Sequence, residues 1–121
     1  MLELSDNDKS QFDQNGFLIA DKLIELSRIP ELKKAFDDLF NGRFETGVRP
    51  DEVNWQQQDG DSRLTRQICN GWKANRAIAR VILDQTIGET IARLAGWSGV
   101  RVMIDNVICT KSTTPLLCFW T

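Results

Sequence analysis

The spacing of hydrophobic and polar residues predicts several helices followed by a late strand. Near the start, Ser5 is a good N-cap and Asp8 follows three residues later, as in a capping box. Gly16 is a typical helix stop, so this polar stretch predicts a short helix. The apolar run at residues 17–20 predicts either a short buried strand or an extended segment.

The most regular pattern lies between residues 30 and 42. Pro30 is well suited to a first helical position, and Asn41-Gly42 predicts the end of the helix. Apolar residues recur there with helical spacing and form one face that should be buried. That face consists of Leu32, Ala35, Phe36, Leu39 and Phe40.

Two more helices are expected after a polar, poorly periodic stretch at residues 42–70, which predicts a loop. The first covers residues 72–83. The second begins at a capping box made by Thr86 and Glu89 and ends at Gly96, with Trp97 packed on its last turn. The residues expected to be buried are Ala74, Ile78, Val81, Ile82, Ile87, Ile91, Leu94 and Ala95.

The segment "VRVMIDNVI", residues 100–108, predicts a strand whose two faces are both largely apolar, as in a larger sheet. Its polar pair, Asp105 and Asn106, is consistent either with structural hydrogen bonds or with a pocket wall, and the pattern leaves both open. We expect few neighbours for this strand beyond residues 17–20. We also expect an irregular tail from Thr110 onward. The local pattern is therefore α+β.

Composition excludes several classes of function. The chain has 121 residues, enough for one domain, and a net charge of −2, so no global field attracts nucleic acid or an anionic membrane. No signal peptide or membrane-spanning run is recognisable. The three cysteines are odd in number and lack zinc-like spacing, which indicates free thiols and a cytoplasmic location.

The chain contains no histidine, which excludes histidine-based triads and histidine-ligated iron or zinc. Lys73, Arg76 and Arg80 recur at helical spacing and could bind an anion. The negative net charge and the lack of interleaved aromatic residues favour a solvated helix face instead. Trp55 lies in the long polar stretch, and long ordered loops are often functional.

Several stretches resemble the phytanoyl-CoA dioxygenase-like family. "LSDNDKSQFDQNGFLIADKLI" resembles the family's opening, and "TRQICNGWK" and "LAGWSGVRVMIDN" resemble a bacterial branch. The similarity runs from Leu4 to Val107. None of these stretches is a catalytic motif.

The resemblance implies a double-stranded β-helix, a cupin-like jelly roll, that uses Fe(II), 2-oxoglutarate and O₂ to hydroxylate a small organic substrate. The iron would be held by two histidines and a carboxylate. The family continues after "VRVMIDNV" with a "WKPPG"-like turn and a His-x-Asp motif, whereas this sequence reads "ICTKSTTPLLCFWT". We therefore expect residues 1–107 to be the N-terminal part of such an oxygenase, and residues 108–121 to be a divergent tail produced by a frameshift, a premature stop or an aberrant gene model.

This interpretation assigns no catalytic residue and no metal ligand, and it expects the chain alone to bind neither Fe(II) nor 2-oxoglutarate. In a full-length relative, Asp105 and Asn106 would line the cofactor pocket, and Arg49 and Trp55 would contact substrate. The alternative is a small non-catalytic interaction module that uses its exposed strand and apolar tail. Either way we expect self-association through that strand and tail. Removing the residues after Val107 should leave the helices folded.

Overall fold

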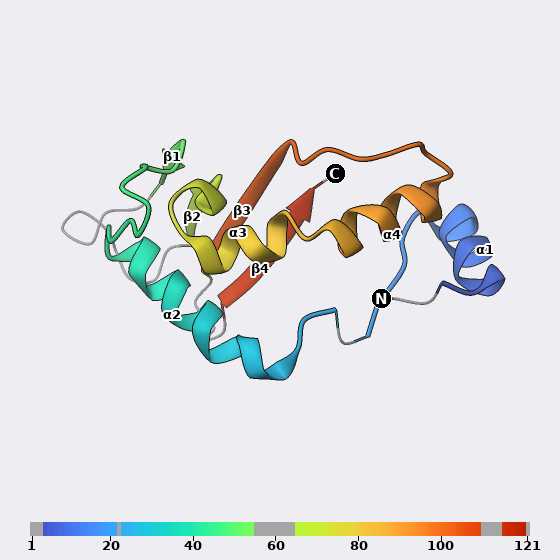
Figure 1. Cartoon of the computed structure of the whole chain (residues 1–121), viewed down its shortest axis with the longest axis horizontal. Helices are drawn as coiled ribbons and strands as arrows, with labels where there is room; N and C mark the ends of the chain where they lie inside the picture. The colour runs from blue at the N-terminus through green and yellow to red at the C-terminus, as the bar shows by residue number, and fades with distance from the viewer. Residues whose placement is uncertain (1–3, 22, 55–64, 110–114, 121) are drawn as a thin grey trace.

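Helices and a four-stranded antiparallel sheet build the molecule, with strand order β1-β2-β3-β4, so the α+β class is confirmed. The computed structural model describes residues 4–21, 23–54 and 65–109, and the backbone of residues 115–120. Helices α2 and α3 lie at the sheet, whereas α1 lies beside α4 at the opposite end of the molecule (Figure 1).

Helix α1, Asp6–Asn15, begins and ends as predicted. The Ser5 hydroxyl accepts a hydrogen bond from the Asp8 N–H at 3.2 Å, and Asp8 Oδ2 accepts one from the Ser5 N–H at 2.8 Å. Gly16 ends the helix in the left-handed region, with φ of 77°. Of the two alternatives predicted for residues 17–20, the buried strand is wrong, because these residues form no strand and the side chain of Ile19 is 81% exposed. An apolar run this short cannot by itself specify a partner.

A short 3₁₀ turn, η1 (Leu26–Arg28), leads into α2, Ile29–Phe40. Pro30 lies in the first turn, where its missing N–H costs no helical hydrogen bond. The Asn41 amide then donates to the Asp37 carbonyl at 2.7 Å and closes the helix. The predicted apolar face is confirmed, since all five of its residues are buried.

The helix predicted over residues 72–83 is divided into a 3₁₀ turn, η2 (Gly71–Lys73), and α3, Arg76–Ile82. The division falls at Asn75, whose side chain caps α3 by accepting from the Ala77 N–H at 2.9 Å. Helix α4, Gln85–Ala95, is capped by Asp84, which accepts from the Thr86 N–H at 2.9 Å. The predicted Thr86–Glu89 capping box is therefore wrong, because Asp84 starts the helix earlier.

The predicted buried faces of these helices are confirmed for α3 and in part for α4. Ile87 and Ile91 are only half-buried, as is Ala95. Trp97 is 60% exposed, so its predicted packing on α4 is wrong, although its backbone N–H donates to the Ala92 carbonyl at 2.8 Å. The buried members are Ala74, Ile78, Val81, Ile82 and Leu94.

The sheet holds β1 (Glu52–Val53), β2 (Arg66–Cys69), β3 (Ile104–Cys109) and β4 (Pro115–Trp120). The late strand was expected to have few neighbours beyond residues 17–20, which is wrong because β3 pairs with β2 on one side and with β4 on the other. The prediction of an irregular tail from Thr110 onward is wrong for residues 115–120, because they form β4. Residues 110–114 lie outside the described part of the chain. Strand β3 also runs across the expected boundary between residues 107 and 108.

Helices α2 and α3 bury their apolar faces against one face of the sheet (Figure 1). Ile68 of β2 and Val107 of β3 lie directly opposite each other, and both are fully buried in this core. The core consists of Leu32, Ala35, Phe36, Leu39, Phe40, Ile68, Ala74, Ala77, Ile78, Val81, Ile82 and Val107. No helix in the described part of the chain has the length and apolar character needed to cross a membrane.

Candidate functional site

Asp105 and Asn106 are both buried, but they lie on opposite faces of β3 because successive strand residues alternate. Asp105 shares the helix-facing side with Val107, and its Oδ2 lies 3.6 Å from the position that a Cβ would occupy on Gly71. Asn106 therefore lies on the face turned away from α2 and α3. The two residues cannot line a single pocket on one side of the sheet.

The Asp105 carboxyl is buried beside the turn that joins β2 to η2. Its Oδ1 accepts from the Trp72 N–H at 3.3 Å, and no described residue donates a hydrogen bond of good geometry to Oδ2. Its backbone is fixed by Asn70, whose N–H donates to the Asp105 carbonyl at 2.8 Å. Asn70 itself lies in the left-handed region, with φ of 56°.

Burial raises the pKa of the Asp105 carboxyl, and the nearby N–H groups of Trp72 and Gly71 oppose that rise. The negative charge of Asp51 raises this pKa further, and the positive charge of Lys73 lowers it. Asp51 forms an ion pair with Lys73, whose ammonium group lies 2.7 Å from Asp51 Oδ2. The arrangement indicates that Asp105 anchors η2 to the sheet.

On the other face, the register places one residue from each of three strands in a line across the sheet. Glu52 lies opposite Cys69, and Cys69 lies opposite Asn106. Gln67 is next to this line and donates to Asn106 Oδ1 at 2.7 Å. We call Glu52, Gln67, Cys69 and Asn106 the polar row.

The polar row is linked by hydrogen bonds around one oxygen. The Cys69 thiol lies 3.1 Å from Asn106 Oδ1 and 3.7 Å from Glu52 Oε2, and it can donate to either. Burial is the largest cause that raises the pKa of the Cys69 thiol, and the Glu52 charge adds to it. The thiol therefore stays protonated near neutral pH. In this form it is a weak hydrogen-bond donor.

Such a row can bind a polar group by hydrogen bonds, but it lacks the groups needed for metal binding. In the described part of the chain, no group of three histidine, cysteine, aspartate or glutamate residues is placed to hold a metal ion. The chain has no histidine that could serve as a base for the thiol. Among the residues of the polar row, Asn106 and Gln67 offer the amide groups suited to orienting a ligand.

The remaining sequence-predicted site residues do not join the polar row in the described structure. Arg49 is exposed, just before the buried Pro50. Trp55 lies outside the described residues. Glu52, Gln67 and Cys69 were not predicted, because no sequence pattern reveals which residues become cross-strand neighbours.

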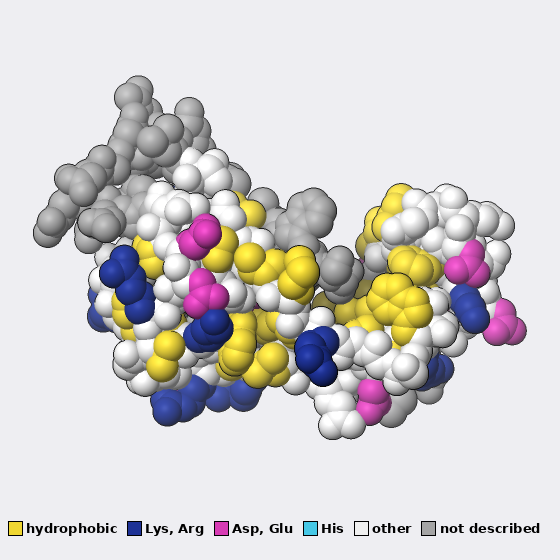
Figure 2. All heavy atoms as spheres, turned by 90° about the horizontal axis from the view of Figure 1, so that it is seen from above, with side chains coloured by type: hydrophobic (Ala, Val, Ile, Leu, Met, Phe, Trp, Pro, Cys, Tyr) yellow, Lys and Arg dark blue, Asp and Glu magenta, His cyan; other side chains and the backbone are white. Residues whose placement is uncertain are grey.

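The basic residues Lys73, Arg76 and Arg80 each form an ion pair, with Asp51, Glu45 and Glu31 respectively. Arg76 and Arg80 are exposed. On the face seen in Figure 2, Lys and Arg side chains are scattered among Asp and Glu and do not gather into one patch. The interpretation as a solvated helix face is supported.

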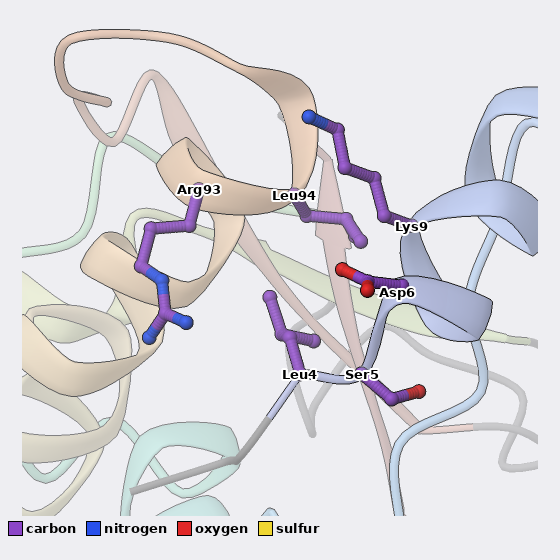
Figure 3. A pocket seen from close by; sticks show the side chains of 6 residues that line it. All are labelled: Leu4, Ser5, Asp6, Lys9, Arg93 and Leu94. Atoms are coloured by element: carbon purple, nitrogen blue, oxygen red, sulfur yellow. The ribbon is translucent and has the colours of Figure 1, made fainter.

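A hollow of about 120 Å³ lies between α1 and α4 (Figure 3). These helices lie at the opposite end of the molecule from β1 and β2 (Figure 1). Leu4 and Leu94 point toward its centre, and Asp6, Lys9 and Arg93 stand around it. Ligand pockets usually measure roughly 300–1,000 Å³, so this hollow between two helices is smaller than a typical ligand pocket.

Comparison of the chain with protein-family models, with curated proteins and with solved structures gave no match.

Proposed function

We propose that residues 4–107 form the N-terminal part of a phytanoyl-CoA dioxygenase-like oxygenase, a protein that uses Fe(II) and 2-oxoglutarate to hydroxylate an organic substrate. The sequence stretches that resemble this family suggest the proposal. One structural observation supports it best: the sheet has a helix-covered apolar face and an opposite face that carries the polar row.

Those two faces suit the first part of a double-stranded β-helix. Helices that pack on one face of a sheet leave the other face to turn toward a second sheet, with a ligand cavity between them. In this proposal Asn106 lies on the cavity side, where its amide orients a polar group of the substrate or cosubstrate. Asp105 supports the turn behind it and does not touch the ligand.

The residues of this chain do not fit the iron that the family would bind. Such iron is held by two histidines and a carboxylate, and the sequence contains no histidine. We therefore assign no chemical step to a metal here. The iron ligands of the proposed oxygenase would have to come from residues that this sequence does not contain.

The coding DNA beyond codon 107 provides a direct test. We expect that reading it in the other frames reveals a "KPPG"-like turn followed by His-x-Asp, and later a second histidine. If no frame contains such a segment, the oxygenase proposal loses its main requirement.

A fusion provides a biochemical test. Residues 1–107 should be joined to the C-terminal half of a phytanoyl-CoA dioxygenase-like protein, and 2-oxoglutarate consumption should be measured with Fe(II). We expect turnover in the fusion and none in the isolated chain, with Asn106→Ala lowering the activity. Asn54→Ala is the matched control, because Asn54 is exposed beside the same sheet. If both variants behave alike, Asn106 has no place in the cavity.

A further inference from the structure

The two edges of the sheet differ in how well they are protected against pairing with another chain. Strand β1 is only two residues long, contains the charged Glu52 and follows Pro50 and Asp51. Short length, charge and proline are the usual devices that keep an edge strand from pairing. Strand β1 is therefore a poor template for another strand.

Strand β4 lacks most of these devices. Its six residues, Pro-Leu-Leu-Cys-Phe-Trp, carry no charge. Its one proline, Pro115, occupies the first position of the strand, where proline is tolerated. In the described part of the sheet, β4 is the last strand and pairs only with β3. Alternate residues of such a strand direct their N–H and C=O groups away from the sheet.

We propose that β4 pairs with β4 of a second copy of this chain, in antiparallel orientation about a twofold axis. Two identical antiparallel strands are complementary to each other around such an axis, so the pairing forms a closed dimer. The absence of charge means that no like-charged side chains meet there. The net charge of −2 gives only weak repulsion between two copies. This surface is independent of the proposed oxygenase function.

The midpoint of β4 lies between Leu117 and Cys118, so a charge at Leu117 lies close to the same charge of the second copy. We expect wild-type chain to form dimers in sedimentation experiments across the micromolar range. Leu117→Lys and Leu117→Glu should each be monomeric, and an equimolar mixture of the two should dimerise again. Leu26→Lys and Leu26→Glu are matched controls, because Leu26 is 82% exposed in η1, and they should dimerise like wild type.

A second measurement covers the case in which a charge in β4 unfolds the chain, which far-UV circular dichroism would reveal. A short bismaleimide should cross-link wild-type dimers through Cys118. The cross-link should be lost in Cys118→Ser and retained in Cys109→Ser. A monomer at every concentration overturns the proposal, and so does a dimer that none of the Leu117 or Cys118 changes affects. Open-ended oligomers would overturn the twofold arrangement.

Discussion

Gly71 occupies the point where α2, η2 and β3 come together. A Cβ built on Gly71 would lie 2.9 Å from Leu39 Cδ1, which is closer than real Cβ contacts, and 3.0 Å from Val107 Cγ2, which is tighter than most of them. Leu39 and Val107 are themselves fully buried, so neither can move aside easily. The missing side chain therefore lets the η2 turn approach the core and deliver its N–H groups to Asp105.

Replacing Gly71 by alanine should destabilise the fold by about 1–3 kcal/mol, because the added methyl group overpacks the core. Gly99→Ala is the matched control, since a Cβ there would have nothing within 4 Å. Urea denaturation followed by circular dichroism measures both variants. Equal stability of the two would show that the core around Leu39 relaxes freely.

Asp105 should give the fold a pH dependence opposite to that of the exposed carboxylates. Because burial raises its pKa in the folded chain, the folded chain binds this proton more tightly than the unfolded chain does. The stabilisation that the protonated Asp105 carboxyl contributes is complete at pH values below the ordinary pKa of aspartate. It is lost as the pH rises through the raised pKa of the folded chain. The facing charges are those of Asp51 and Lys73, which shift this window in opposite directions.

The comparison of wild type with Asp105→Asn isolates this effect. Unfolding free energies measured across a pH series should show wild type losing stability relative to the variant as the pH rises. The carboxyls with lowered pKa contribute stability that is lost as the pH falls, and they are common to both proteins. They are Asp8, Asp38, Glu45 and Asp51. A constant difference across the series would contradict a proton bound at Asp105.

At the scale of elements, the sequence was most informative where several signals agreed. Helix α2 has a proline in its first turn, an apolar face at regular spacing and an Asn-Gly end, and the structure confirms all three. Strands β1 and β2 were missed because they are short and lie in a polar stretch. The start of α4 was misplaced because Asp84 and Thr86 are both acceptable caps, and only the backbone geometry distinguishes them.

The different burial of α3 and α4 predicts different costs for the same substitution. Ile78→Ala in α3 should cost about 2–5 kcal/mol, because Ile78 is fully buried in the core. Ile91→Ala in α4 removes the same atoms from a half-buried side chain and should cost clearly less. Urea denaturation of the two variants tests this. Equal costs would mean that α4 is packed as tightly as α3.

At the scale of the whole molecule, the candidate site depends on strand register, which local patterns do not specify. The polar pair in β3 was visible in the sequence, but its division between two faces requires knowing which face the helices cover. The link from Asn106 to Gln67 and Cys69 joins residues far apart in the chain. The pairing of β4 with β3 could not be predicted either, because the apolar run "PLLCFW" has no period that distinguishes a strand from an irregular tail.

The sheet also couples the C-terminal residues to the helices. Val107 belongs both to β3 and to the core that α2 and α3 form, and β3 is paired along its whole length with β4. Deleting residues 108–121 removes β4 together with the last two residues of β3. The shortened β3 would then hold Val107 in place through β2 alone. We therefore expect this deletion to loosen the helical core, contrary to the expectation from sequence.

Deleting residues 1–16 is the matched control, because α1 buries no residue and should be removable at small cost. Thermal unfolding followed by the helical circular dichroism signal should show a clearly lower midpoint for the chain lacking residues 108–121 than for the chain lacking residues 1–16. The reason is that loss of β4 weakens a strand of the central core, whereas loss of α1 only uncovers part of α4. If the chain ending at Val107 instead keeps the full midpoint, β4 contributes nothing to the core, and the helices with β2 and β3 form an independent folding unit.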